Sequence, residues 1–222
     1  MSPGRVILIN CGSSSLKYNL FDTADEKKNL RGTVERIGTD KTLYKAQKPD
    51  GETSRNLPKG THADALKAVI EELESSGMKA ARDIAAVGHR VVHGGEKFRG
   101  PVMITDDVLK EIEALSAIAP LHNPINAAGI KAARSLLPKV PQVAVFDTAF
   151  HHTLPPYAFL YGLPYSYYEQ QHVRRYGFHG MSHFYVALKA AQTLKRPFNE
   201  LEVISCHLGN GASLCAIDHG RS

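Results

Sequence analysis

The sequence lacks the features of a membrane protein, a nucleic-acid-binding protein or a disulfide-rich secreted protein. It has no apolar run long enough to span a bilayer, and the apolar stretch near its start is too short for a signal peptide. Its 27 basic and 22 acidic residues are spread along the chain without a lysine or arginine block. Its three cysteines are odd in number and form no disulfide framework. We therefore expect a cytoplasmic globular protein, without membrane or nucleic-acid partners, whose net charge of +5 suits a small anionic substrate.

What the sequence does contain is one pattern written twice, at residues 6–22 and again at residues 203–218. Each copy is an apolar strand, a turn of glycine and small polar residues, and a second apolar strand. Such a turn exposes successive backbone N–H groups, so an anion can bind on it. Two of these hairpins about 200 residues apart predict two related domains that hold one polyphosphate. The pattern points to a phosphotransferase.

The first hairpin differs from a Walker A loop. That motif needs a second glycine before its lysine and a helix after it. Here Ser14-Ser15-Leu16-Lys17 has no such glycine, and the chain continues as an alternating strand. We therefore expect Lys17 to approach a phosphate from the second strand of a hairpin, as in the actin, sugar-kinase and Hsp70 group.

The order of predicted elements indicates an α/β fold of the actin-like (ribonuclease H-like) type, a mixed sheet with flanking helices. Strands are predicted at 5–10, 15–22 and about 30–37, and residues 38–60 are expected to be irregular. Helices and strands then alternate. We assign residues 1–150 to a first actin-like domain and residues 151–222 to the truncated start of a second copy. The chain is expected to be the front part of a longer protein.

Several helix boundaries follow from capping signals. Thr61 begins a capping box with Asp64, and Thr105 is expected to cap a second helix. Asn123 is predicted as an N-cap with Pro124 at the first helical position, and Ser182 as the N-cap of a helix that ends near residue 195. Buried strands are predicted at residues 84–92 and 142–146.

Three side chains stand at places where chemistry is expected. Arg90 ends a predicted strand and can fork onto a carboxylate or phosphate, although a lone arginine is as often a surface residue. Asp147 follows an apolar strand, where it can hold Mg²⁺ or cap the next turn. His179 precedes a helix and can offer an N–H group to phosphoryl oxygens. His179 and His183 have the spacing of zinc ligands, but no glutamate stands between them as in HExxH proteases.

Six motifs together resemble the acetokinase family of acetate, propionate and butyrate kinases, over essentially the whole chain. They lie at residues 10–17, 88–95, 119–124, 146–151, 176–180 and 207–211. The resemblance implies Mg²⁺-dependent transfer of a phosphoryl group from ATP to acetate, giving acetyl phosphate and ADP, in a cytoplasmic homodimer. A second transition-state arginine, the adenosine-binding segments and a metal-site glutamate of the family are expected beyond the equivalent of Ser222.

The resemblance also implies roles for individual residues. Asn10 corresponds to the family's magnesium-site residue, Arg90 to the ligand of the acetate carboxylate, and Asp147 and His179 to its catalytic residues. The pocket for the methyl group corresponds to Val92, Leu121 and Phe178. The nucleotide phosphates are assigned to Ser13, Ser15, Lys17, His207, Leu208, Gly209, Asn210 and Gly211.

Chemistry constrains these roles. Acetate is already ionised at neutral pH, so the nucleophile needs no general base, and Asp147 is expected to orient the metal, its waters or the substrate. Propionate kinase activity is the alternative, because one methylene in an apolar pocket is worth only about 1–3 kcal/mol. A non-catalytic binding module is a second alternative. These residues on their own are expected to be nearly inactive.

Overall fold

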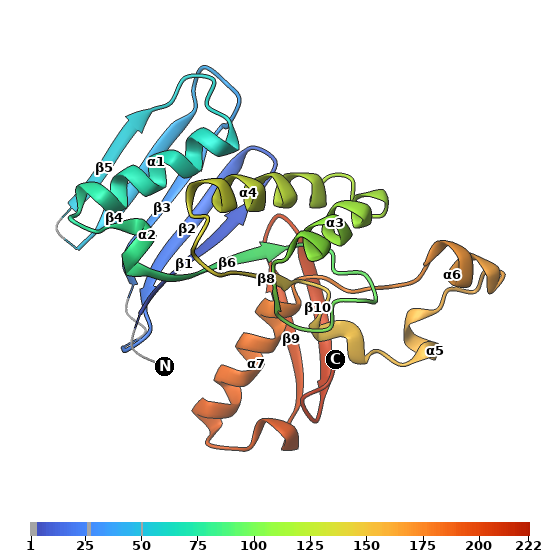
Figure 1. Ribbon diagram of the computed structural model, residues 1–222. Coiled ribbons are helices and arrows are strands. Elements are labelled where there is room, and N and C mark those ends of the chain that lie inside the picture. Colours follow the sequence, from blue (N-terminus) through green and yellow to red (C-terminus); the bar gives the residue numbers. More distant parts are fainter. Residues whose placement is uncertain (1–3, 26–27, 50) are drawn as a thin grey trace. The chain divides into compact units, whose positions relative to one another are not determined.

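The computed structural model describes residues 4–25, 28–49 and 51–222 and divides into two compact units (Figure 1). Unit 1 comprises Met1–Val91 and Pro101–Val145, and unit 2 comprises Val92–Gly100 and Phe146–Ser222. The chain therefore enters unit 2 for one short loop, returns to unit 1, and finishes in unit 2.

Unit 1 is built on a mixed sheet with the strand order β5-β4-β3-β2-β1-β6-β8-β7. The first five strands form an antiparallel meander, β6 lies parallel to β1, and β7 pairs antiparallel with β8. The strands are β1 (Arg5–Cys11), β2 (Ser15–Asp22), β3 (Lys28–Glu35), β4 (Leu43–Lys48), β5 (Gly51–Asn56), β6 (Ile84–Val91), β7 (Val102–Met103) and β8 (Gln142–Phe146). The mixed sheet confirms the predicted fold class.

One face of this sheet carries the hydrophobic core of unit 1. Ile7 and Ile9 of β1, and Leu16 and Tyr18 of β2, are buried at every second position, as expected for strands with one covered face. Helices α1 and α4 cover that face (Figure 1). The helices of the unit are α1 (His62–Ser75), α2 (Ala80–Asp83), α3 (Asp106–Ala114), η1 (Leu115–Ala117) and α4 (Asn123–Leu136).

The irregular segment expected over residues 38–60 is wrong, because most of it forms β4 and β5. In β4, Tyr44 and Ala46 are buried and alternate with polar residues. Every residue of β5 is exposed, since it is the edge strand of the sheet. An edge strand needs no apolar alternation, so its polar composition resembles that of a loop.

In unit 1, two predicted caps are confirmed and one is corrected. Thr61 forms a capping box with Asp64, and the Thr105 side chain accepts from the backbone N–H of Val108. Asn123, however, is the first residue of α4 rather than its N-cap, and His122 takes the cap position. The Asn123 side chain is instead fully buried, and its Nδ2 donates to the Ile112 carbonyl of α3 at 3.2 Å.

Unit 2 contains one long helix and one hairpin. Its elements are η2 (Phe150–Thr153), α5 (Pro156–Phe159), α6 (Ser166–Gln171), α7 (Gly180–Leu194), η3 (Phe198–Glu200), β9 (Glu202–Leu208) and β10 (Ala212–Asp218). The inner face of the β9–β10 hairpin packs against α7, with Ala187, Cys215 and Ile217 buried. The outer face is apolar and open: Ile204 is 75% exposed and Leu214 is 69% exposed.

The predicted Ser182 cap of the last helix is wrong. Helix α7 begins at Gly180, and His179 occupies the cap position in the left-handed region at φ 57°. Gly180 N–H donates to the Asp147 carbonyl 2.8 Å away, and a Cβ on Gly180 would lie 2.3 Å from that oxygen. This contact is available only to glycine, and it starts the helix two residues before Ser182. No helix among the described residues has both the length and the apolar content to cross a bilayer.

Candidate active site

The turn of the first hairpin is fixed from the core side of unit 1. Gly12 N–H donates to the Ser15 carbonyl at 2.7 Å and closes the turn between β1 and β2. Asn126 of α4 donates from Nδ2 to the Cys11 carbonyl at 2.9 Å, and His62 donates from Nε2 to the Gly12 carbonyl at 2.8 Å. Carbonyls of the turn are thus bonded to helices, while the Ser13 side chain is exposed.

Asn10, Lys17 and Arg90 gather at the end of this hairpin. Asn10 and Lys17 are directly opposite each other in the β1–β2 pair. Arg90 lies on β6, the parallel neighbour of β1, and its Nη1 donates to Asn10 Oδ1 at 3.2 Å. The carboxyl ends of parallel strands meet at one sheet edge, where ligands of α/β proteins bind. Three of the predicted site residues are therefore neighbours in unit 1.

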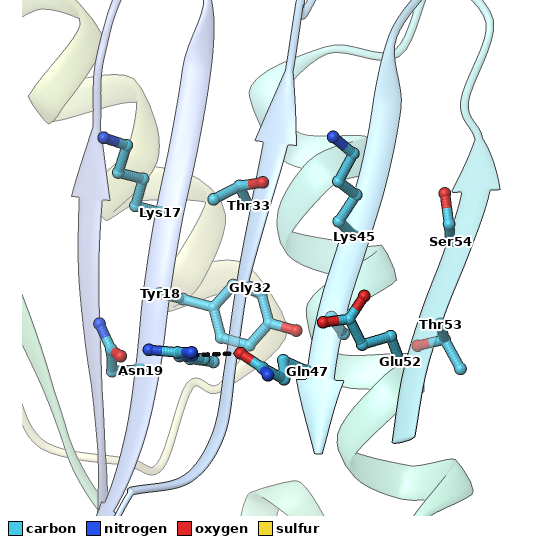
Figure 2. Close-up of a pocket in the computed structure, with 12 residues that line it drawn as sticks. Lys17, Tyr18, Asn19, Gly32, Thr33, Lys45, Gln47, Glu52, Thr53 and Ser54 are labelled. Carbon is cyan, nitrogen blue, oxygen red and sulfur yellow. Dashed lines mark hydrogen bonds between the residues drawn. The ribbon is translucent and has the colours of Figure 1, made fainter.

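Beside Lys17 the open face of the sheet is hollowed (Figure 2). The pocket has a volume of about 460 Å³ and is lined by residues of β2–β5. Lys17 and Lys45 point along the same side of the sheet, and Arg31 donates to Gln47 Oε1 at 2.6 Å. The Lys17 ammonium group is exposed on this side and accessible to an anion.

Leu121, a further predicted site residue of unit 1, is largely exposed. It follows η1, shortly before α4, and is 74% exposed. Cys11, by contrast, is buried behind the hairpin, where Gly129 of α4 packs so closely that an added Cβ would lie 2.4 Å from the sulfur. Burial raises the pKa of the Cys11 thiol to about 12, so it stays protonated and unreactive at neutral pH.

In unit 2, Asp147 is buried directly after β8. Its backbone carbonyl receives the N–H of Gly180, which ties it to the start of α7. The neighbouring Thr148 accepts from the Gly94 N–H through Oγ1 at 3.0 Å. One bond ties the 92–100 loop to Thr148, and the other ties residue 147 to the start of helix α7.

Phe178 is held by two histidines. His93, next to Val92, packs edge-on against Tyr176 and Phe178, with ring centroids 4.4 and 5.6 Å away. His151 donates from Nε2 to the Phe178 carbonyl at 2.9 Å. Burial lowers the pKa of His93 to about 4 and also lowers the pKa of His151, so both rings are neutral at physiological pH. Phe178 itself is 41% exposed.

The second hairpin brings His179 and His207 together. Their rings stack with centroids 4.1 Å apart and an interplanar angle of 13°. His179 Nδ1 is bonded to Ser213 Oγ at 2.9 Å, and His207 Nδ1 to Ser182 Oγ at 2.9 Å. The loop at residues 208–211 that follows His207 is exposed. A Cβ on Gly211 would lie 3.4 Å from His179 Cε1 and 3.7 Å from Nε2, so this loop adjoins that edge of the ring.

Sequence reasoning did not single out Glu96. Its carboxylate accepts from Arg174 Nη1 at 2.7 Å, from the Tyr168 hydroxyl at 3.0 Å and from His172 Nδ1 at 3.2 Å. Burial raises the pKa of Glu96, but these hydrogen bonds outweigh it and hold the pKa below its usual value. The Arg174 guanidinium lies 3.6 Å from the centroid of the Phe159 ring. Glu96 thereby anchors the segment that leads to Phe178, and no local sequence motif signals a carboxylate with this function.

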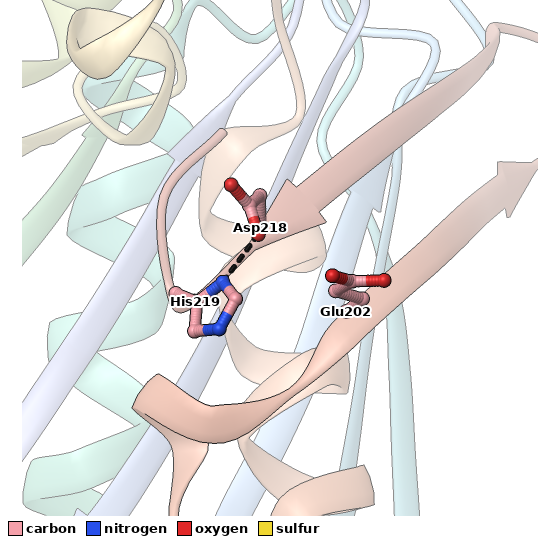
Figure 3. Close-up of side chains that lie close together, drawn as sticks. All are labelled: Glu202, Asp218 and His219. Atoms are coloured by element: carbon pink, nitrogen blue, oxygen red, sulfur yellow. Dashed lines mark hydrogen bonds and ion pairs between the residues drawn. The ribbon is translucent and has the colours of Figure 1, made fainter.

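A group of potential metal ligands lies at the far end of the second hairpin (Figure 3). Glu202 and Asp218 are opposite each other across β9 and β10, and His219 follows, bonded to Asp218. The candidate ligand atoms of the three residues lie within 4.8 Å of one another, and all three residues are exposed. None of them was predicted as a site residue. His183 does not form a zinc site with His179. Both of its ring nitrogens are hydrogen-bonded to serine hydroxyls instead.

Solved structures of known kinases share this fold. A propionate kinase from Francisella tularensis aligns with a TM-score of 0.93 and 38% identity, and an acetate kinase from Porphyromonas gingivalis with a TM-score of 0.91 and 40% identity. Each alignment covers 98% of this chain and 56% of the other. The fold is thus that of the acetate and propionate kinases.

The sequence comparisons agree. The acetokinase family model matches residues 5–222, and the chain belongs to the acetokinase family. An acetate kinase from Anoxybacillus flavithermus is 52% identical over 219 residues, and one from Thermoanaerobacter pseudethanolicus is 51% identical over 223 residues. Both alignments cover 98% of this chain and 55% of the relative, so the chain spans about half the length of the curated relatives it matches.

Proposed function

We propose that this chain provides the first phosphate hairpin and the carboxylate-binding arginine of an acetate kinase, which transfers the terminal phosphoryl group of ATP to acetate. The observation that carries the proposal is the Arg90–Asn10 hydrogen bond at the end of a glycine-rich hairpin, in a chain of the acetokinase family. The enzyme is proposed to act as a cytoplasmic homodimer.

Arg90 binds the carboxylate of acetate in this proposal. A guanidinium group matches a carboxylate geometrically and stays charged at all physiological pH values. Its bond to Asn10 holds the guanidinium at the end of β6, so it needs little reorganisation to receive the substrate. Val92, Leu121 and Phe178 are the proposed contacts of the methyl group.

The two hairpins bind the nucleotide phosphates. Ser13, Ser15 and Lys17 act from the first hairpin, and residues 207–211 from the second. Mg²⁺ prefers carbonyl, carboxylate, phosphate and water oxygens, and the Asn10 side-chain carbonyl at this sheet edge is a donor of that kind. When bound, the ion neutralises phosphate charge. Phosphoryl transfer is mostly positioning and charge neutralisation, which is what cations and N–H groups at these places provide.

Asp147 and His179 act during the transfer. Because acetate arrives ionised, Asp147 has no proton to remove, and its proposed task is to orient the substrate or metal-bound water. His179 donates an N–H to an oxygen of the transferring phosphoryl group. Its stack on His207 and its bond to Ser213 support this role, since both restrict the orientation of the ring.

Propionate is the second candidate substrate, because one aligned structure is that of a propionate kinase. Acetate is favoured because the relatives at 51–52% identity are acetate kinases. The two acids differ by one methylene, which an apolar pocket discriminates by only about 1–3 kcal/mol.

The test is acetyl phosphate formation, trapped as the hydroxamate. The chain is continued after Ser222 with the remaining part of the A. flavithermus acetate kinase, and this chimaera is compared with the unaltered A. flavithermus enzyme. We expect turnover with MgATP and acetate, and a lower kcat/KM with propionate. A folded chimaera that phosphorylates neither acid would contradict the proposed function, and one that prefers propionate would replace the substrate.

A further inference from the structure

Four side chains of unit 2 form a continuous row of hydrogen bonds that begins at His179. Its Nδ1 is 2.9 Å from Ser213 Oγ. The same oxygen is 2.8 Å from His183 Nε2, and His183 Nδ1 is 3.0 Å from Ser205 Oγ. Ser205 and Ser213 lie on the inner face of the β9–β10 hairpin, and His183 lies on α7.

In the hydrogen bond between Ser205 and His183, at the end of the row away from His179, the donor and the acceptor can be assigned. Ser205 is 4% exposed, and among the residues that the structure describes its hydroxyl has one hydrogen-bond partner, His183 Nδ1. A buried hydroxyl proton without an acceptor is energetically unfavourable. The Ser205 hydroxyl therefore donates, and His183 Nδ1 accepts.

That direction fixes the rest of the row. Burial lowers the pKa of His183, whose side chain is 1% exposed, so the ring is neutral and carries one proton. Because Nδ1 accepts, the proton is on Nε2 and is donated to Ser213 Oγ. The single hydroxyl proton of Ser213 is then directed to His179 Nδ1. A neutral His179 must carry its own proton on Nε2.

We propose that Ser205, His183 and Ser213 are positioning residues that hold His179 as the Nε2–H tautomer. We call these three residues and their hydrogen bonds the relay. The inference rests on the proposed function in one respect, that His179 donates to the phosphoryl group. Nε2 lies on the ring edge beside Gly211 of the second phosphate loop, so the relay places the N–H on the edge that adjoins that loop. The other edge of the ring is occupied by the Ser213 bond.

The tautomer is measured directly by long-range ¹H–¹⁵N correlation spectra of the histidine-labelled 222-residue protein at about pH 8, where unperturbed imidazoles are neutral. His179 is assigned by comparison with His179→Gln. We expect the shift of a proton-bearing nitrogen at Nε2 and the shift of a hydrogen-bonded acceptor at Nδ1. A proton-bearing Nδ1 in the wild-type protein overturns the relay, whatever the enzyme's activity.

Three variants separate the relay from general packing. Ser213→Thr keeps the hydroxyl and should keep the wild-type tautomer. Ser213→Asp presents acceptors only, so Nδ1 of His179 should become proton-bearing. Ser182→Ala removes the equivalent serine–imidazole bond from the stacked His207 and should leave the nitrogen shifts of His179 unchanged. Unchanged shifts in Ser213→Asp, or reversed shifts in Ser182→Ala, contradict the relay.

Activity separates the relay from the function it serves. In the chimaera at alkaline pH, Ser213→Asp should lower kcat by about tenfold or more, because one N–H donor to the transferring group is lost, while KM for acetate changes little. Ser213→Thr, which keeps the hydroxyl, should keep the kcat of the unmodified chimaera. If Ser213→Asp changes the tautomer of His179 as expected but leaves kcat unchanged, the link between the tautomer and phosphoryl transfer is refuted. If the unmodified chimaera shows no turnover, the proposed function is refuted instead.

Discussion

Gly177→Ala should destabilise unit 2, and the structure gives two separable reasons. Gly177 has φ +78°, a left-handed conformation that costs a residue with a side chain about 1–2 kcal/mol. An added Cβ would also lie 2.6 Å from Cγ and 2.7 Å from Cδ2 of His151. Overpacking of this kind costs about 1–3 kcal/mol. The sum is a loss of about 2–5 kcal/mol in the free energy of unfolding.

The clash also reaches the candidate site. His151 is held by its Nε2–H bond to the Phe178 carbonyl, so it cannot move away from residue 177 without breaking that bond. Phe178 and His179 directly follow Gly177. The chimaera carrying Gly177→Ala should therefore lose turnover even under conditions where it stays folded, because a small displacement of positioned groups is costly in transfer reactions.

Urea unfolding followed by tyrosine fluorescence measures the effect. The chain has no tryptophan, and all nine tyrosines except Tyr18 and Tyr44 lie in unit 2, so the signal reports mainly on that unit. Gly162→Ala is the matched control, since a Cβ there would meet no heavy atom within 4 Å, and it should change stability by less than about 0.5 kcal/mol.

A double-mutant cycle separates the two causes. In a His151→Ala background the ring is absent, so Gly177→Ala should retain only the backbone cost of about 1–2 kcal/mol. If the full penalty persisted without the ring, the contact with His151 would not be its source. If Gly177→Ala had no effect in the wild-type background, the local geometry described for residues 176–179 would be wrong.

Three further outcomes are expected. Arg90→Ala in the chimaera should lower kcat/KM for acetate by about 10- to 100-fold, as the loss of a charged hydrogen bond does, and leave KM for ATP near its original value; the reverse pattern would mean that the role is misassigned. Burial lowers the pKa of His93 to about 4, below the unfolded value of about 6.5. The contribution of His93 to the free energy of unfolding should therefore be constant above pH 6.5 and should become destabilising as the pH falls towards 4. His93→Phe, which keeps an aromatic ring against Tyr176, should flatten that decline, and an equally steep acid transition would count against the assignment. Ellman's reagent should modify one thiol quickly in the folded protein, at exposed Cys206, whereas Cys11 and Cys215 are buried and burial raises their pKa values; rapid reaction of all three would disprove the burial.

The parts of the fold that local chemistry determines were predictable from the sequence. Alternating apolar residues give β1 and β2, and the Thr61 and Thr105 side chains cap α1 and α3 as expected. Strand β5 was missed because an exposed edge strand buries no side chains, so nothing in its composition distinguishes it from a loop.

The contacts around the candidate site depend on residues far apart in the sequence. Helix α7 starts at Gly180 rather than at the expected cap because Gly180 meets the carbonyl of Asp147. Glu96 is joined to residues 168–174, and His183 to serines on two strands, by hydrogen bonds that no sequence spacing encodes. The motifs gave the residues that we propose bind ligands, but they did not indicate the residues that hydrogen-bond to them.

We propose that both glycine-rich hairpins of this chain bind phosphate. The most direct test is a titration of the ¹⁵N-labelled protein with MgATP, followed at the backbone amides. We expect saturable shifts at residues 12–15 of the first hairpin and at residues 209–211 of the second. Lys17→Ala should weaken the shifts at the first hairpin, and Gly211→Val should weaken those at the second. Saturable MgATP binding that shifts amides elsewhere and leaves both turns unchanged would contradict it.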